Sequence, residues 1–238
     1  MSATDERRPG TVRVVAIDGP GGSGKSTVSR EVARRLGWRY LDTGAMYRAV
    51  TLAVLEQRVR LDDPDAIGAL AAALDVEVGT DPDDPWTRID GRIVTAEIRT
   101  REVTNAVSAV SAVPAVRSRL VDVQRRVIAD GDVVVEGRDI GTTVVPDAGT
   151  KIFLTASAAV RAERRSRDAA APDAGDASTA QREIEQRDHR DSTREASPLT
   201  CAEDACEIDA THLTAEEVAS LIVNRHQAGS TARQSVTR

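Results

Sequence analysis

A short segment near the start of the chain has the composition and spacing of a loop that holds phosphate groups. It reads GPGGSGKST and fits the pattern G-x-x-x-x-G-K-[ST], in which glycines let successive backbone N–H groups turn towards one anion. Lys25 would supply a charge for the β- and γ-phosphates, and the hydroxyl of Ser26 would bind Mg²⁺. The residues expected around a nucleoside triphosphate are Gly19, Pro20, Gly21, Gly22, Ser23, Gly24, Lys25, Ser26 and Thr27.

The plainer alternative for this segment is a glycine-rich turn that happens to contain a lysine. Among 32 basic residues the only lysines are Lys25 and Lys151, so lysine stands where a compact ammonium is needed instead of the planar fork of arginine. The apolar segment 12–17 predicts a strand before the loop, and the residues from Lys25 onwards predict a helix. This order places the positive end of the helix dipole at the phosphates, which favours the phosphate loop.

Length and composition restrict the class of protein. The chain has 238 residues, a net charge of −6, and no apolar run long enough to cross a membrane. Its charged first residues do not resemble a secretory signal, and Cys201 and Cys206 have neither zinc nor redox spacing, so we expect reduced thiols. We therefore expect a cytoplasmic monomer that has no membrane partner and, because it is acidic, no nucleic-acid partner.

Predicted strands and helices alternate in the rhythm of a parallel sheet covered by helices on both faces. After the loop, helical spacing runs to Gly37, a strand is expected at 38–41, and Thr43 is expected to cap the next helix. Two further buried strands are predicted at 133–135 and 152–154. The expected fold class is therefore α/β.

Segment 62–100 breaks this rhythm. A helical patch is followed by short alternating segments, and Asp90-Gly91 has the composition of a hairpin turn. We predict a small helix-plus-antiparallel insertion within a core formed by 11–61 and 101–226. Two helices are expected between 101 and 130, the second beginning at Pro114.

The last part of the chain is rich in charge. An arginine-rich helix is expected over 156–168, an irregular tract over 168–178 and a charged helix over 179–191. A last strand at 207–209 precedes the capping box Thr214-Ala-Glu-Glu217, which should open a helix ending near Val223. The end segments 1–10 and 227–238 are expected to be disordered tails.

Two polar clusters follow predicted strands, where a parallel sheet presents its ligand crevice. Thr43 and Arg48 follow the second strand and could reach a phosphate, although a capped helix with a surface arginine would look the same. Arg138 follows the third strand and could bind a phosphate through two N–H groups. Its neighbours Glu136 and Asp139 could contact Mg²⁺ through water or accept from a base amino group; a salt-bridged turn is the alternative.

A third cluster lies in the charged helix near the C-terminus. Arg187, Asp191 and Arg194 share one helical face, with Arg190 beside them. Such a stripe is usually a solvated surface. In a chain that already has a phosphate loop, it also fits an anion clamp.

The segments IDGPGGSGKST, LDTGAMYR, EGRDIGT and QRDHRDSTR, in this order, resemble the bacterial cytidylate kinase family over about residues 12–225. The resemblance implies a P-loop kinase fold, with a parallel sheet flanked by helices, an insertion at 62–100 that binds the nucleoside monophosphate, and a short lid at about 157–180. It also implies transfer of the γ-phosphoryl group of ATP to CMP or dCMP with Mg²⁺. The family commonly has Asp where this chain has Glu136, which leaves the contact of that carboxylate with a metal-bound water open.

The resemblance assigns roles to individual residues. The 5′-phosphate of CMP would be held by Arg48, Arg138 and Arg194. Thr43 is also expected to belong to the CMP site. The cytosine would be read by Ser108, Arg117 and Asp139, and the ribose hydroxyls by Arg187 and Asp191. ATP would be contacted in the lid by Arg161 and Arg164. The residues expected to act in catalysis are Lys25, Arg138, Arg164 and Arg194.

Other functions remain possible at this point. Another P-loop kinase acting on AMP, UMP or shikimate would share the loop and the arginines. A nucleotide-binding protein without activity would leave the arginine clusters unexplained. A GTPase switch is excluded, because its guanine-reading Asn-Lys-x-Asp motif has no counterpart at either lysine.

Overall fold

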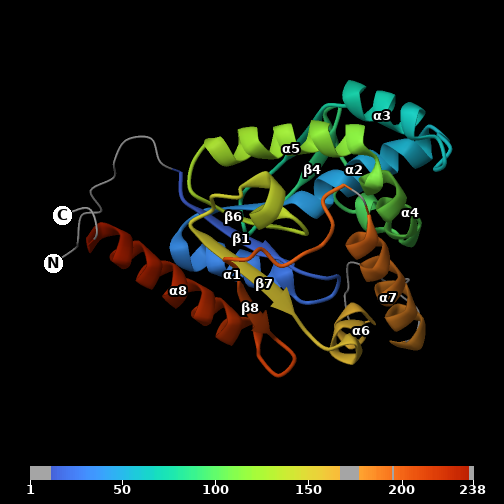
Figure 1. The fold of residues 1–238 in the computed structure, drawn as a ribbon. Coiled ribbons are helices and arrows are strands. Elements are labelled where there is room, and N and C mark those ends of the chain that lie inside the picture. Colours follow the sequence, from blue (N-terminus) through green and yellow to red (C-terminus); the bar gives the residue numbers. More distant parts are fainter. Residues whose placement is uncertain (1–11, 167–176, 195, 236–238) are drawn as a thin grey trace.

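The computed structural model describes residues 12–166, 177–194 and 196–235 (Figure 1). The predicted tail 1–10 and most of the predicted irregular tract 168–178 lie outside these residues. The main sheet has five parallel strands. In spatial order they are β2 (Arg39–Asp42), β6 (Val133–Gly137), β1 (Val14–Asp18), β7 (Thr150–Thr155) and β8 (Cys206–Asp209).

Helices cover both faces of this sheet, so its central strands are buried throughout. In β1, Val14 and Ala16 pack into one hydrophobic cluster, while Val15 and Ile17 pack into the other, as the two-residue period of a strand requires. The first cluster lies under α2 (Thr43–Glu56), α4 (Arg101–Ala112) and α5 (Pro114–Ala129). The second lies under α1 (Lys25–Leu36) and α8 (Ala215–Ser235), on the opposite face in Figure 1. The predicted α/β fold is confirmed.

The segment predicted as an insertion forms a small unit beside the main sheet. Its elements are α3 (Pro64–Ala73), β3 (Val76–Val78), β4 (Thr87–Ile89), β5 (Arg92–Ile93) and the short helix η1 (Glu97–Arg99). The strands pair antiparallel in the order β3-β4-β5. Asp90 and Gly91 have φ of 49° and 79°, the left-handed conformation that a tight hairpin needs, so the predicted turn is confirmed.

A loop of the insertion is tied to the edge of the main sheet. The backbone N–H of Tyr40 in β2 donates to Thr80 O at 2.8 Å. From α1, Arg30 Nε donates to Pro82 O at 2.6 Å, and Arg34 Nε lies 2.6 Å from Asp83 Oδ1. Because β2 is an outer strand, this loop covers part of a sheet edge.

The ends of two helices differ from expectation. The side chain that caps α2 is that of Asp42, which accepts from Ala45 N at 3.0 Å, so the predicted cap at Thr43 is wrong. The Thr43 hydroxyl instead donates to Glu136 O at 2.7 Å, so it is not available for capping. The capping box at Thr214 opens α8 as predicted, but the helix continues to Ser235, so the predicted tail from 227 is wrong for the residues described.

Three elements lie at the carboxyl ends of the strands, near the predicted phosphate loop. They are the one-turn helix η2 (Ile140–Val144), α6 (Ala158–Ser166) and α7 (Ala177–Thr193). Helices α6 and α7 pack against each other. Over the part of the chain that the structure describes, no helix is both long enough and apolar enough to span a bilayer.

Candidate active site

The phosphate loop joins β1 to α1, and its glycines adopt conformations that other residues rarely reach. Gly19, Gly22 and Gly24 have φ of 149°, 75° and 95°. A Cβ on Gly19 would lie 2.1 Å from the backbone oxygen of Leu154, so a side chain there would collide with β7. The loop therefore passes close to the neighbouring strand and ends at Gly24, the N-cap of α1.

Lys25 lies inside this loop in a site that favours anions. It is 7% exposed, and its Nζ donates to Pro20 O at 2.7 Å. Burial, and secondly the guanidinium of Arg138, lower the pKa of Lys25 to about 7, whereas Glu136 opposes the shift. A phosphate group would supply the negative charge that this ammonium lacks.

Glu136 lies near the end of β6, where its side chain meets Ser26 in the first turn of α1. Its Oε2 accepts from Ser26 Oγ at 3.1 Å, and its Oε1 accepts from the Tyr40 hydroxyl. Burial, and secondly the nearby Asp42, raise the pKa of Glu136 to about 7. The sequence offered Glu136 and Asp139 as carboxylates that could contact a metal ion. Glu136 is the one that bonds the Ser26 hydroxyl.

Asp139 lies in a separate cluster with two arginines. Its Oδ2 accepts from Arg117 Nη2, and its Oδ1 is 3.8 Å from Arg194 Nη2. The side chains of Asp139 and Arg117 are only 6% and 5% exposed. The Arg117 guanidinium also lies over the ring of Tyr47, 5.5 Å from its centroid. This is within the distance of about 6 Å at which a cation is attracted to an aromatic ring. These residues form a buried cluster of charges.

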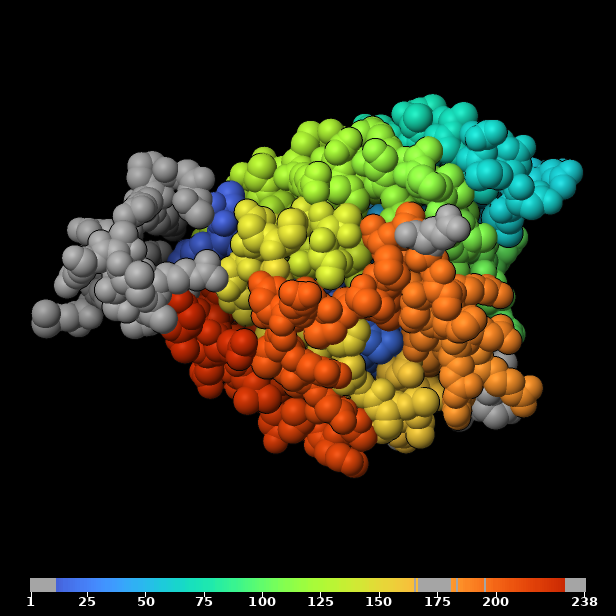
Figure 2. All heavy atoms as spheres, in the orientation of Figure 1, coloured from blue at the N-terminus to red at the C-terminus, as the bar shows by residue number. Residues whose placement is uncertain are grey.

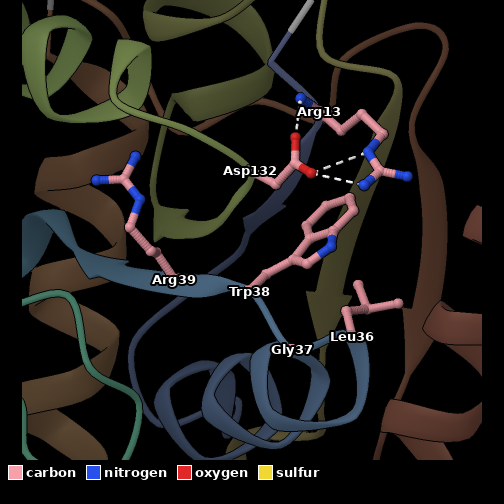
Figure 3. A pocket seen from close by; sticks show the side chains of 6 residues that line it. All are labelled: Arg13, Leu36, Gly37, Trp38, Arg39 and Asp132. Atoms are coloured by element: carbon pink, nitrogen blue, oxygen red, sulfur yellow. Dashed lines mark hydrogen bonds and ion pairs between the residues drawn. The ribbon is translucent and has the colours of Figure 1, made fainter. Parts of the chain in front are cut away.

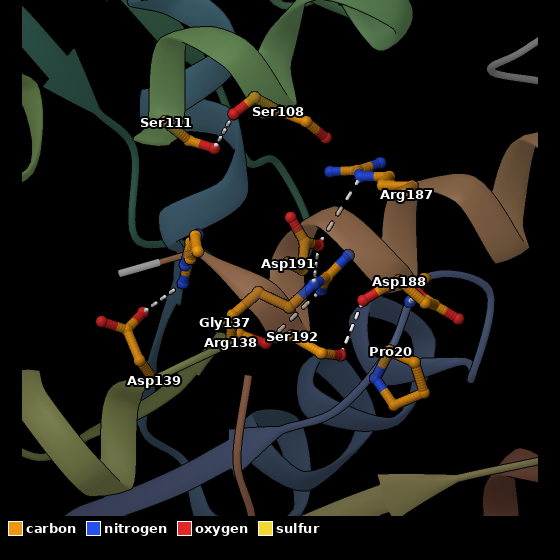
Figure 4. A network of polar contacts seen from close by, with 12 residues as sticks. Pro20, Ser108, Ser111, Gly137, Arg138, Asp139, Arg187, Asp188, Asp191 and Ser192 are labelled. Carbon is orange, nitrogen blue, oxygen red and sulfur yellow. Dashed lines mark hydrogen bonds and ion pairs between the residues drawn. The ribbon is translucent and has the colours of Figure 1, made fainter. Parts of the chain in front are cut away.

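Arg138 joins the loop to α7. Its Nε donates to Asp191 Oδ2 at 3.0 Å, and Arg187 Nε is 3.9 Å from the same oxygen (Figure 4). A Cβ on Gly21 would lie 3.6 Å from Arg138 Nη2, so the guanidinium borders the phosphate loop. Although burial opposes it, Arg138 and then Arg187 hold the pKa of Asp191 below its usual value.

The two arginines predicted to contact ATP both reach the loop from α6. Arg161 Nη1 donates to Gly21 O at 3.2 Å and also bonds Asp188 Oδ2. Arg164 Nη1 donates to Ser23 O at 3.0 Å, and its Nη2 donates to Ala210 O at 2.8 Å. The structure thus brings α6, α7 and the loop together. In Figure 2, blue atoms from the start of the chain are visible at the floor of a small opening with yellow and orange segments at its rim.

Two predicted acceptor residues have other partners. Arg48 Nη1 donates to Ile98 O at 3.1 Å and to Thr104 Oγ1 at 2.8 Å, which directs it to η1 and α4. Ser108 is buried in α4, which contacts α7, and its carbonyl accepts from Ser111 Oγ at 3.2 Å (Figure 4).

Several residues of the site were missed by the reasoning from sequence. Asp18 accepts from Ile140 N and Gly141 N, both at 2.8 Å, and its position at the end of β1 was a usable signal. Tyr40 gave no signal, because its place in a predicted strand indicates only that the side chain is buried. Asp188 gave none either, because it is one carboxylate in a run of charged residues.

A cavity of about 290 Å³ lies at the opposite end of the sheet. It is lined by Arg13, Leu36, Gly37, Trp38, Arg39 and Asp132 (Figure 3). Its charges are largely paired, since Arg13 Nε and Nη2 bond Asp132 Oδ2 at 3.0 and 2.6 Å. It adjoins the amino ends of parallel strands, whereas ligands of such sheets bind at the carboxyl ends.

Comparison with known proteins agrees with this geometry. Residues 15–228 match the family described as cytidylate kinase. The cytidylate kinase of Rhodococcus opacus (strain B4) is 54% identical over 207 residues, which cover 86% of this chain and 90% of the relative. That of Limosilactobacillus fermentum is 51% identical over 214 residues, covering 89% and 94%.

Solved structures add only a distant likeness. The shikimate kinase from Acinetobacter baumannii in complex with shikimate has a TM-score of 0.47 and 14% identity, covering 92% of this chain and 95% of that one. The family match spans the phosphate loop, the arginine clusters and nearly all of the fold. The chain therefore belongs to the cytidylate kinase family.

Proposed function

We propose that the protein transfers the γ-phosphoryl group of ATP to CMP or dCMP, giving ADP and CDP or dCDP. The observation that carries this proposal is the position of Arg138. Its guanidinium borders the phosphate loop at Gly21 and bonds Asp191 of α7, so one arginine lies between the expected donor and acceptor sites. Membership in the cytidylate kinase family supports the choice of acceptor.

On the donor side, Lys25, Arg161 and Arg164 supply three cations around one loop. Lys25 Nζ now bonds Pro20 O, and we infer that it exchanges this carbonyl for a phosphate oxygen. The positive charge of Arg138, which helps to lower the pKa of Lys25 after burial, also attracts an anion. A phosphate bound there would raise that pKa and hold Lys25 in its charged form. Arg161 and Arg164 would neutralise charge on the migrating group.

The residues present also fit Mg²⁺. Ser26 is an exposed residue at the start of α1, and its hydroxyl bonds Glu136, a serine–carboxylate arrangement suited to a metal ion and its water. The described residues contain no cluster of three metal-ligating side chains, so phosphates and water would complete the coordination. When bound, Mg²⁺ would supply positive charge to the phosphates.

On the acceptor side, two groups of residues have separate tasks in this proposal. Arg138 and Arg194 would hold the 5′-phosphate, and Arg187 and Asp191 would contact the ribose. Asp139 would accept from the exocyclic amino group of cytosine, because a carboxylate has acceptor positions beyond the one that Arg117 uses. We also propose that Thr43, Arg48 and Ser108 belong to the site that binds the acceptor nucleotide.

The chemistry requires positioning more than proton transfer. The attacking atom is already a phosphate oxygen, so no strong general base is needed. Guanidinium groups and the loop N–H groups lower the charge repulsion between two polyanions and align them for in-line attack. Closing the site around both nucleotides would exclude water as a competing acceptor.

A coupled assay of ADP release tests the proposal. Purified protein with ATP and Mg²⁺ should release ADP with CMP and dCMP far faster than with UMP, AMP or shikimate. No CMP-dependent ADP release would refute it.

The base-reading role has its own variant. Asp139→Ala should reduce the preference for CMP over UMP in kcat/KM, because the amino group loses its buried acceptor. Asp122→Ala, an exposed carboxylate on α5, is the matched control and should keep the parent ratio. An unchanged ratio in Asp139→Ala would remove this residue from base recognition.

A further inference from the structure

We infer that Asp188 of α7 is a built-in substitute for phosphate, whose carboxylate occupies the loop until ATP displaces it. This inference rests on the proposed use of ATP at that loop. The backbone N–H of Gly21 donates to Asp188 Oδ1 at 3.1 Å. The other carboxylate oxygen, Oδ2, bonds Arg161 Nη1. Figure 4 shows Asp188 beside Pro20, the residue that precedes Gly21.

Both partners of this carboxylate are groups that a bound phosphate needs. The loop N–H groups form the anion cradle, and Arg161 is a proposed ligand of ATP. Asp188 thus has the charge and the donors that a phosphate oxygen would have in the same place. The side chains of Arg161 and Asp188 are 11% and 18% exposed, so water screens their pairing only in part.

Triphosphate and carboxylate cannot share this position. A phosphate group in the loop would bring negative charge against Asp188 and compete for the same N–H and the same guanidinium. The carboxylate must therefore leave Gly21 and release Arg161 before Arg161 can bind ATP. We call these two contacts of the Asp188 carboxylate, with Gly21 N and Arg161 Nη1, the latch. ATP should bind more tightly to a protein without the latch, because ATP then no longer has to break these contacts.

The latch also connects the two nucleotide sites. Asp188 and Asp191 lie on adjacent positions of one helical face, three residues apart in α7. Asp191 bonds Arg138, and Ser192 Oγ donates to Asp188 O at 2.6 Å within the same turn. Release of Asp188 by ATP would therefore remove one of the contacts that hold the helix segment carrying the proposed ribose contacts, while the bond of Asp191 to Arg138 remains.

Binding of ATP in the absence of acceptor tests the latch directly. We would titrate Mg²⁺ and ATP calorimetrically into the parent protein, Asp188→Ala, Asp188→Asn and the control Glu185→Gln. Glu185 is exposed one turn earlier on α7, so its variant loses the same charge without touching the loop. Asp188→Ala should bind ATP roughly tenfold more tightly, Asp188→Asn by an intermediate factor, and the control should match the parent.

Hydrogen exchange over residues 177–193 gives a second readout that a change in ATP affinity alone would not move. ATP should raise exchange in the parent, whereas Asp188→Ala should show the raised level before ATP is added. Equal or weaker ATP binding by Asp188→Ala, with folding verified by circular dichroism, would overturn the latch while leaving the proposed function intact. Failure of every protein to bind ATP would overturn the proposed function and the latch together.

Discussion

Replacing Asp139 should destabilise the protein more than replacing its partner Arg117. Asp139 faces two guanidiniums, those of Arg117 and Arg194, and all three side chains are at most 7% exposed. Asp139→Asn leaves two buried cations facing each other. Arg117→Gln leaves Asp139 with Arg194 as a counter-charge, so the two sides of the pair are not equivalent.

The size of the difference follows from burial. Leaving a buried charge without its partner costs about 3–5 kcal/mol, which is the expected loss for Asp139→Asn. Burial and the positive charge of Arg117 already lower the pKa of Arg194, so these cations repel each other once the carboxylate is neutral. Arg117→Gln should cost about 1–3 kcal/mol, the range for a lost buried hydrogen bond.

Urea unfolding of the nucleotide-free protein at neutral pH, followed by circular dichroism, measures both losses. Asp132→Asn serves as the control, because its partner Arg13 is 39% exposed and such pairs contribute about 0–1 kcal/mol. Equal losses in Asp139→Asn and Arg117→Gln, or losses no greater than the control's, would refute the reasoning about Arg194.

Three further changes test other parts of the site. Lys25→Ala should lower kcat on the order of a thousandfold in the ADP-release assay, because a cation held at the transferring phosphates is lost; activity within about tenfold of the parent would contradict its role. Burial raises the pKa of Asp18 from 3.8 to about 6, so the folded protein favours the protonated carboxyl. The contribution of this group to the free energy of unfolding is therefore complete below about pH 4. It is lost, by about 3 kcal/mol, as the pH rises through 6. Asp18→Asn should therefore flatten the dependence of the urea midpoint on pH between 4 and 7, and an unchanged slope would count against the shift. Arg34→Ala should speed hydrogen exchange in loop 80–83 with little change elsewhere, because the loop loses the ion pair between Arg34 and Asp83. Exchange equal to the parent's would show that this ion pair does not hold the loop in place.

Local signals in the sequence predicted much of the fold. The glycines of the phosphate loop, Pro114 at the start of α5 and the capping box at Thr214 each specify a backbone conformation within a few residues, and each is found where expected. The same holds for the Asp90-Gly91 turn. Such features depend on neighbours in sequence, so the sequence alone can identify them.

The parts that could not be predicted depend on distant partners. Asp42 and Thr43 are both good helix caps, and the choice between them is made by Glu136 O, which binds the Thr43 hydroxyl. The length of α8 was underestimated because apolar spacing fades after Val223. His226 nevertheless packs edge-on against Trp38, with ring centroids 4.9 Å apart.

The same limit applies to the candidate site. Residues predicted from a motif or a strand end, such as Arg138 and Asp139, do lie in charged clusters just past the end of β6. Arg48 lies in a motif too, but its partners come from η1 and α4, which no local pattern indicates. Asp188 shows the converse, because only the packing of α7 on the loop distinguishes it from neighbouring charges.

The bond from Tyr40 to Thr80 has a consequence for any attempt to shorten the protein. Deleting 62–100 would take away this cover of β2 and leave the Tyr40 N–H of an outer strand without its partner. Copies of such a shortened chain would then be expected to add to one another strand by strand and precipitate. The inserted segment thus protects the sheet from aggregation, whatever else it contributes to nucleotide binding.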